Sequence, residues 1–214
     1  MPDVVFLGDS IVENWSGTNL GISRAELHGI AKTFDRYFHK DQGGLVNGLP
    51  LGIAGDRISQ LLYRVEHGGF GKLDPHVFWL MIGTNDAIKD NCSEESIVAG
   101  IIAVAESIAK QRPNATVVIN LLLPRSRWVG SVVQSINQRI KCYAQATKRN
   151  VIYFNATSLF YDPTTSTKLK HLPDMEHPDE EGTKAWTSAM AQKVAKLIRH
   201  RTVAQTTKAK NGPN

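Results

Sequence analysis

Hydrophobic residues along the chain fall into short continuous runs, separated by longer stretches in which they recur every three or four positions. Five runs are apolar at almost every residue, at positions 4–8, 45–53, 76–83, 115–123 and 150–155. Continuous apolar runs of this length are typical of strands that are covered on both faces, as in parallel sheets. The second run is the weakest of the five, because Gly48 and Pro50 interrupt it.

The stretches between these runs show the spacing of amphipathic helices. Polar Ser93 and Ser96 offer a start for one of them. The apolar stripes lie at 30–38, 58–65, 97–109, 132–144 and 185–197. Strands and helices therefore alternate along the whole chain, which predicts an α/β sandwich around a mainly parallel sheet. The sequence contains no internal repeat and no linker that would mark a domain boundary.

Length and composition predict one globular domain. The chain has 214 residues, of which 42% are hydrophobic and 21% are charged, enough for one substantial core. The net charge of +5 owes much to the C-terminal end, where the last 22 residues carry six Lys or Arg and no acid. We interpret that end as the close of a helix followed by a solvated segment, in preference to a nucleic-acid-binding arm. The expected division is a domain of residues 1–200 and a flexible basic tail of residues 201–214.

Cysteine content and hydropathy favour a cytoplasmic protein. Cys92 and Cys142 lack the spacing of metal ligands, so a reducing compartment is the simpler expectation. The first apolar run begins at residue 4 and leaves no room for a signal peptide. No apolar run approaches the roughly 18 residues that a membrane-spanning helix needs, so no stable membrane insertion is expected.

The residues that directly follow the strands are the candidates for a functional site, because ligands of open α/β sheets bind beyond the carboxyl ends of the strands. These residues lie at 8–10, 52–56, 83–86 and 124–125. Ser10, in "FLGDSI", falls at such a strand-to-helix turn. There a helix N-terminus and free backbone N–H groups would favour negative charge on a substrate oxygen. Taken alone, Ser10 has two interpretations, a helix N-cap or a nucleophile, and Asp9 is also suited to the cap.

A serine nucleophile needs a base, and one histidine has the right neighbours. In "HLPDMEHPDEEG", His177 follows Asp174 by three positions, so one turn of chain can bring the carboxylate to the imidazole. The acids at 179–181 are interpreted as complements of a helix dipole. Metal ligation by His171, Asp174 and His177 is the less favoured alternative. Pro173 breaks any regular helical face, and no HExxH motif is present.

Two further strand-end segments offer donors for an oxyanion hole. Gly55, in "GIAGD", allows close approach of a ligand to its backbone N–H. Asn85, in "GTND", offers a side-chain amide at the end of the central strand. Both residue types are also common in turns, which is the structural alternative for each.

The motifs "FLGDSI", "GIAGD", "IGTND" and "DMEHP", in this order, resemble the SGNH (GDSL-type) hydrolases. The nearest likeness is to catalytic subunits of intracellular platelet-activating-factor acetylhydrolase, over about residues 3–200. The resemblance implies a flavodoxin-like three-layer α/β/α fold with a five-stranded parallel sheet in the order 2-1-3-4-5, and no metal or cofactor. It also implies Ser10 as nucleophile, His177 as base with Asp174 as its partner, and an oxyanion hole from Ser10, Gly55 and Asn85.

The reaction expected from this resemblance is hydrolysis of carboxylic esters, with short acyl groups favoured, on a lipid, sugar or small alcohol. A homodimer is suggested by the same likeness. Two alternatives stay open: a catalytically idle binding or scaffold subunit, and a nucleotide-binding flavodoxin-like protein, although "GGFGKL" lacks the spacing of a P-loop. Segment 11–15, loop 16–26 and Trp128 are candidates for pocket walls, with ordinary packing of the aromatics favoured. Arg125 either binds an anionic group or pairs with a neighbouring acid, and we favour the pair.

Overall fold

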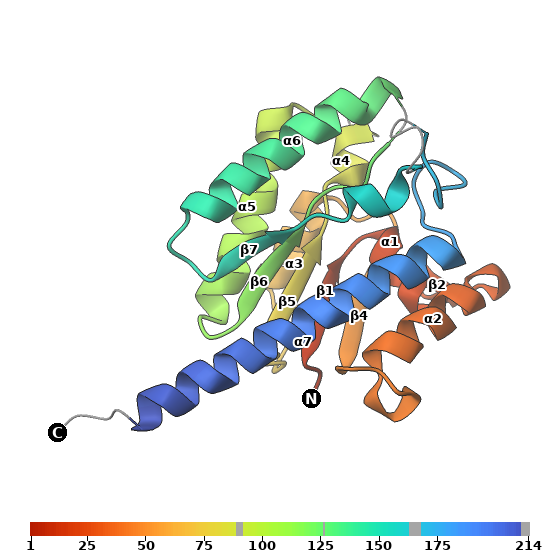
Figure 1. Ribbon diagram of the computed structural model, residues 1–214. Coiled ribbons are helices and arrows are strands. Elements are labelled where there is room, and N and C mark those ends of the chain that lie inside the picture. The colour runs from red at the N-terminus through yellow and green to blue at the C-terminus, as the bar shows by residue number, and fades with distance from the viewer. Residues whose placement is uncertain (89–91, 126, 163–167, 211–214) are drawn as a thin grey trace.

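The computed structural model describes residues 1–88, 92–125, 127–162 and 168–210, and for 127–130 and 202–210 the backbone only. Figure 1 shows a central twisted sheet with helices on both faces. No helix among the described residues is long and apolar enough to cross a membrane. Trp128 falls in the part without a described side chain, so its suggested place at a pocket lies outside the description.

The sheet consists of five parallel strands. They are β1 (Val4–Gly8), β4 (Gly48–Gly52), β5 (Val77–Met81), β6 (Thr116–Asn120) and β7 (Val151–Phe154), in the spatial order β4-β1-β5-β6-β7. Each of the five predicted apolar runs contains one of these strands, and the predicted fold class is confirmed. Counted among these five alone, the order reads 2-1-3-4-5. The labels run higher because two further strands form a separate hairpin.

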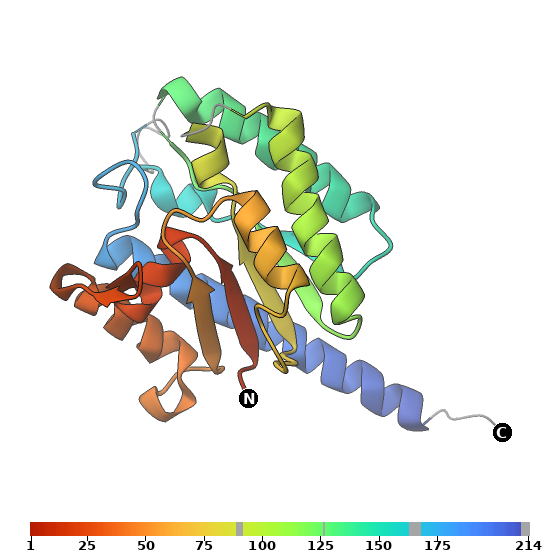
Figure 2. The same ribbon diagram turned by 180° about the vertical axis from the view of Figure 1, so that it is seen from behind.

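Helices form a layer on each face of the sheet (Figures 1 and 2). One layer holds α3 (Ile58–Glu66), α5 (Glu94–Gln111) and α6 (Arg127–Ala146). The other holds α2 (His28–Phe38) and α7 (Glu180–Lys210), which pack against each other. Ser93 caps α5 by accepting a hydrogen bond from the N–H of Ser96, as the sequence suggested. Helix α7 continues past residue 200, and the predicted boundary between domain and tail stays a prediction.

The remaining elements are short and lie in the connections. They are helices α1 (Ser10–Glu13) and α4 (Thr84–Ile88), the hairpin strands β2 (Thr18–Asn19) and β3 (Ile22–Ser23), and the 3-10 turns η1 (Asn14–Ser16), η2 (Ala25–Leu27), η3 (Lys40–Gln42) and η4 (Thr157–Phe160). The hairpin was not predicted, because a strand of two residues carries no alternation to detect. The segment 16–26, expected as a loop, contains it.

Alternate residues of β1 serve two separate cores, as the two-residue period of a strand requires. Val5 and Leu7 face the α3, α5 and α6 layer, whereas Val4 and Phe6 face the α2 and α7 layer. All four are at most 1% exposed, so β1 is covered on both faces and cannot move without disturbing both cores. The strand that leads to Ser10 is therefore one of the most firmly held in the molecule.

A polar contact lies inside the core between the sheet and the α2 and α7 layer. The buried side-chain oxygen of Asn120 accepts hydrogen bonds from the indole N–H groups of Trp79, at 3.2 Å, and of Trp186, at 3.3 Å. Its amide group donates to the carbonyl of Leu121 at 2.7 Å. Both indoles are fully buried, and buried donors need an acceptor. Asn120 thus joins β5, β6 and α7 through one side chain.

Replacement of Asn120 by Ala should lower the free energy of unfolding by about 2 to 5 kcal/mol, because two buried indole N–H groups lose their acceptor. Urea unfolding followed by circular dichroism measures the loss. Asn114→Ala, at an exposed turn, is the matched control and should change stability by less than about 0.5 kcal/mol. A loss no larger than that of the control would show that the indoles find other acceptors.

Candidate functional site

Ser10 is the first residue of α1, directly beyond the carboxyl end of β1. Asp9 is the N-cap of this helix, since its Oδ1 accepts a hydrogen bond from the N–H of Ile11 at 3.0 Å. Of the two sequence interpretations of Ser10, the helix cap is therefore excluded. The serine hydroxyl is free for another partner, and the side chain is 7% exposed.

Two glycines allow α1 to lie where it does. A Cβ atom at Gly8 would fall 2.3 Å from the carbonyl oxygen of Met81, and one at Gly52 would fall 2.3 Å from the backbone nitrogen of Glu13. No side chain fits at such distances, so the backbone at the ends of β1 and β4 can approach its neighbours only with glycine. The first turn of α1 consequently sits against the ends of both strands.

The hydroxyl of Ser10 meets a histidine from the other end of the chain. Ser10 Oγ lies 2.9 Å from Nε2 of His177, and Nδ1 of the same imidazole lies 2.7 Å from Oδ2 of Asp174. A serine, an imidazole and a carboxylate joined in this order form the arrangement in which a base can take the serine proton and a carboxylate orients that base. The structure brings together all three residues singled out in the sequence.

The loop that carries Asp174 and His177 is held by its own backbone and by an arginine. Oδ1 of Asp174 accepts the N–H groups of Glu176, at 2.8 Å, and of His177, at 2.7 Å. Arg125 donates to the carbonyl of Met175 at 2.8 Å and forms an ion pair with Glu176 at 3.1 Å. The pairing favoured for Arg125 from the sequence is confirmed, and this pairing fixes the loop that presents His177.

The hydrogen bonds that Asp174 accepts also keep its carboxylate charged. Partial burial raises the pKa of Asp174, but hydrogen bonds from the backbone and ring of His177 and from the N–H of Glu176 outweigh it, so the pKa lies below its ordinary value. Asp174 is therefore ionised at neutral pH. An ionised carboxylate stabilises the imidazolium that would form when His177 takes a proton.

The candidate donors for a developing negative charge stand on three segments that follow β1, β4 and β5. The backbone N–H groups of Ser10 and Gly55 find no acceptor among the described residues. Gly55 has a φ of +83°, with open space where a Cβ would stand. Asn85, 1% exposed, begins α4 with Thr84 and donates through Nδ2 to the carbonyl of Asp56 at 2.8 Å. One hydrogen of that amide remains for a substrate oxygen.

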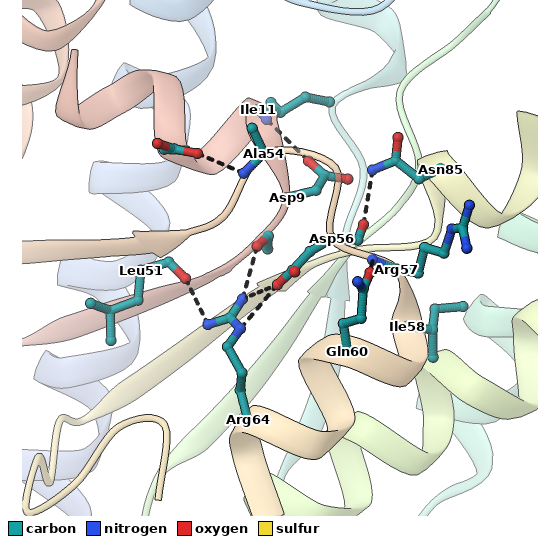
Figure 3. Close-up of polar contacts among 12 residues, drawn as sticks. Asp9, Ile11, Leu51, Ala54, Asp56, Arg57, Ile58, Gln60, Arg64 and Asn85 are labelled. Atoms are coloured by element: carbon teal, nitrogen blue, oxygen red, sulfur yellow. Dashed lines mark hydrogen bonds and ion pairs between the residues drawn. The ribbon is translucent and has the colours of Figure 1, made fainter. Parts of the chain in front are cut away.

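An arginine that the sequence analysis did not single out ties together the ends of β1 and β4 and the loop that carries Gly55 (Figure 3). Arg64, on α3, donates through Nε to Oδ2 of Asp56 at 2.9 Å and through its Nη atoms to the carbonyls of Leu51 and Gly8, both at 3.2 Å. The carboxylate and the two carbonyls lie at the ends of β4 and β1 and in the Gly55 loop. Nothing in the local sequence marks Arg64, because on α3 it looks like any solvent-facing residue.

Glu13 is the second residue that the sequence analysis did not identify. It stands on α1 one turn after Ser10 and is 5% exposed, with hydrogen bonds from three other positions. A signal was available: Glu13 follows the apolar Ile11 and Val12 and precedes the fully buried Trp15. A carboxylate in such a buried segment requires donors nearby. Trp15 itself packs against Phe6 and Trp186, so packing rather than a pocket wall explains it.

His171 and Asp179 lie close to Asp174 and His177 in the sequence but have other roles. Nδ1 of His171 lies 3.3 Å from Oδ1 of Asp179. Asp179 accepts the N–H of Gly182 at 2.7 Å and so caps the start of α7, as expected of an acid at that place. No group of three or more His, Cys, Asp or Glu within the described ranges is arranged to hold a metal ion.

Fold and site together define an α/β protein with a serine–histidine–aspartate arrangement at the carboxyl edge of its sheet. A family model described as "GDSL-like Lipase/Acylhydrolase family" matches residues 6–185, which is most of the chain. The protein belongs to this family. Family membership supports hydrolysis of ester bonds as its chemistry.

Individual relatives agree with this assignment. The chain is 29% identical over 126 residues to the platelet-activating factor acetylhydrolase IB subunit beta homolog of Drosophila melanogaster, covering 59% of this chain and 47% of the fly protein. It is 27% identical over 143 residues to the human subunit alpha2, covering 65% and 53%. The matches thus span about half the length of these relatives. A GDSL-like lipase structure from Bacteroides thetaiotaomicron is 25% identical, with a TM-score of 0.67 over 90% of this chain and 87% of that chain.

Asp9 carries the most unusual ionisation of the site. Complete burial, with a smaller contribution from the carboxylate of Glu176, raises the pKa of Asp9 to about 7, against the opposing N–H of Ile11. Oδ2 of Asp9 has no hydrogen-bond partner in the part of the chain that the structure describes. A carboxyl group whose pKa is higher in the folded than in the unfolded chain binds more protons when folded. Its contribution to stability is therefore present in acid and is lost as pH rises from about 4 to about 7.

Asp9→Asn keeps the oxygen that caps α1 and removes the titration. The free energy of unfolding of this variant should equal that of the wild type near pH 3, below the unfolded pKa of Asp, and exceed it increasingly up to about pH 7.5. Urea unfolding at a series of pH values measures the difference. Parallel pH profiles of the two proteins would contradict a buried, protonated Asp9.

Proposed function

We propose that this protein is a serine esterase that cleaves carboxylic esters of short acyl groups through an acyl-enzyme. The observation that carries the proposal is the 2.9 Å contact between Ser10 Oγ and His177 Nε2, with Asp174 on the other ring nitrogen. A serine hydroxyl is a poor nucleophile unless such a base removes its proton. The family supports the same chemistry.

Acylation is the first of two steps. Ser10 Oγ attacks the acyl carbon while its proton passes to Nε2 of His177, and the carbonyl electrons move to oxygen. In this proposal, the N–H groups of Ser10 and Gly55 and the amide of Asn85 donate to that oxygen. The tetrahedral intermediate then expels the alkoxide, which takes the proton from His177 and leaves as an alcohol.

Deacylation repeats the sequence with water. His177 takes a proton from water as the oxygen attacks the acyl-serine, and the second tetrahedral intermediate releases the carboxylic acid. Ser10 recovers its proton from His177. Asp174 keeps the ring oriented with Nε2 toward Ser10 throughout, and its negative charge stabilises the imidazolium in both steps.

The acyl group is proposed to be short, acetyl above all. The support is the likeness to relatives that are named acetylhydrolases. The alcohol is proposed to belong to a lipid, a sugar or a small molecule. Apolar side chains are exposed near the site at Leu20, Ile53 and Met175, with 66%, 41% and 53% exposure, which is compatible with an ester that has an apolar part.

Ser10→Ala should abolish hydrolysis of p-nitrophenyl acetate, with kcat/KM reduced by at least about 1,000-fold, because no other group can form the acyl-enzyme. The fold should persist, since Ser10 is not the cap of α1. A fluorophosphonate should label the wild type once, at Ser10, by mass spectrometry, and should not label the variant. Ser96→Ala, on the surface helix α5, is the control that should keep full activity.

The same experiment separates the remaining alternatives. An idle binding subunit would show neither turnover nor labelling in the wild type, and a nucleotide-binding protein would bind ATP or FMN in place of reacting. With the wild type active, esters from acetate to octanoate test the acyl preference, and kcat/KM should be highest for acetate. A folded Ser10→Ala variant with normal activity would overturn the proposed mechanism.

A further inference from the structure

The carboxylate of Glu13 joins three separate parts of the chain beside Ser10. Its Oε2 accepts the backbone N–H of Ala54 at 2.6 Å, and its Oε1 accepts the backbone N–H of Gly21 at 2.7 Å and the hydroxyl of Thr18 at 3.0 Å. Figure 3 shows the dashed line that reaches Ala54. One side chain on the nucleophile helix thus holds both the loop after β4 and the β2–β3 hairpin.

The contact with Ala54 bears on the proposed reaction because Ala54 directly precedes Gly55. Gly55 has no hydrogen bond of its own among the described residues, and its left-handed φ of +83° is compatible with more than one orientation of the peptide. The loop has one turn of its own, in which the N–H of Asp56 donates to the carbonyl of Ile53 at 3.0 Å. From outside it is held by Glu13 at Ala54, and by Asn85 and Arg64 at Asp56. The anchors at Ala54 and Asp56 stand on either side of Gly55.

The hydrogen-bonding chemistry of Glu13 suits it to hold the loop that carries Gly55. Three N–H or O–H donors converge on a carboxylate that has only acceptor atoms. Burial raises the pKa of Glu13, but the donors at Gly21, Ala54 and Thr18 outweigh burial and bring the pKa below its ordinary value. Hydrogen bonds to a charged acceptor are shorter and stronger than neutral ones, so the carboxylate holds both segments firmly.

We propose that Glu13 is a positioning residue of the ester-hydrolysing site, which fixes the Gly55 N–H toward the oxygen of the tetrahedral intermediate. This inference rests on the proposed function and adds a residue to it. Glu13 and Ser10 share the single rigid turn of α1, which sits against the glycines that end β1 and β4. The nucleophile and the backbone donor are thereby held relative to each other through one short helix.

Glu13→Gln tests the proposal with almost no change in shape. The amide of Gln has one acceptor oxygen and one donor group, whereas both oxygens of Glu13 accept. The oxygen of Gln will favour the side with two donors, at Gly21 and Thr18. The NH₂ group then faces the N–H of Ala54, and two donors repel. The variant therefore releases the Ala54 end of the contact selectively.

The expected result is a fall in kcat for p-nitrophenyl acetate of about 10- to 100-fold, with KM changed by less than about threefold. Loss of a whole oxyanion donor costs about 100- to 1,000-fold, and a displaced donor loses part of this. A boronic acid, whose adduct with Ser10 places an oxygen at the same donors, should lose affinity by a similar factor. Binding of acetate as a product inhibitor should stay the same.

Two controls separate positioning from general stability. Thr18→Val removes a donor from the same carboxylate but leaves Ala54 in place, so it should keep kcat within about threefold of the wild type. Glu66→Gln makes the same chemical change at an exposed position and should change neither parameter. Circular dichroism and urea unfolding establish that each variant is folded under assay conditions.

A folded Glu13→Gln variant with normal kcat and normal boronic acid affinity would overturn the proposal. If that variant does not fold, Glu13→Asp, which keeps the charge but shortens the side chain, must show the loss of kcat; normal kcat in Glu13→Asp would likewise overturn it. Failure of this proposal is distinguishable from failure of the proposed function. Activity in Ser10→Ala would sink the esterase mechanism, whereas an inactive Ser10→Ala beside a fully active Glu13→Gln would sink only the role of Glu13.

Discussion

The hydrogen bond between Ser10 and His177 joins two residues 167 positions apart in the chain. Neither partner is held by its own neighbours alone. Ser10 stands at the end of β1, which is buried between two cores, and His177 stands in a loop just before α7, which packs on one of those cores. The sheet and the final helix must therefore be in register before the two side chains can meet. The rest of the site depends on this contact.

Polar side chains around Ser10 hold neighbouring loops and strand ends together through hydrogen bonds, which apolar packing cannot provide. Arg64 binds three groups at the ends of β1 and β4 and in the loop after β4. Glu13 binds one group in that loop and two in the β2–β3 hairpin. Such side chains are costly to bury, and the cost is offset because nearly every donor and acceptor is satisfied. Among the described residues near Ser10, Oδ2 of Asp9 and Oδ1 of Asn85 are buried without a hydrogen-bond partner, and burial raises the pKa of Asp9. The edge of the sheet is thus rigid through hydrogen bonds, while its interior is rigid through packing.

Much of this architecture was predictable from the sequence. The five strands follow from continuous apolar runs, and the five main helices from regular apolar stripes, because burial on a period of about 3.6 residues leaves a direct trace in composition. Ser10, Asp174 and His177 were identifiable since each stands at a strand or helix end with a fitting neighbour. Gly55 and Asn85 were candidates from their places after strands, and the resemblance to a family favoured that role over an ordinary turn.

What the sequence could not predict depends on contacts between distant segments. Arg64 lies on an ordinary helical position, and the apolar segment around Glu13 marks that residue but not its partners. Both bind groups far along the chain, such as Gly8 and Ala54. The β2–β3 hairpin is too short to show a pattern. The choice between Asp9 and Ser10 as the cap of α1 was open, because both side chains can accept the same N–H. Three-dimensional placement decided it in favour of Asp9.

The most direct test of the central claim is a crystal structure of the protein after reaction with a fluorophosphonate. The phosphorus should be bonded to Ser10 Oγ, and its phosphoryl oxygen should lie within about 3.2 Å of the backbone nitrogens of Ser10 and Gly55 and of Nδ2 of Asn85. His177 Nε2 should remain within hydrogen-bonding distance of Ser10 Oγ. A phosphoryl oxygen that points away from these three donors, or an adduct on any other residue, would contradict the account.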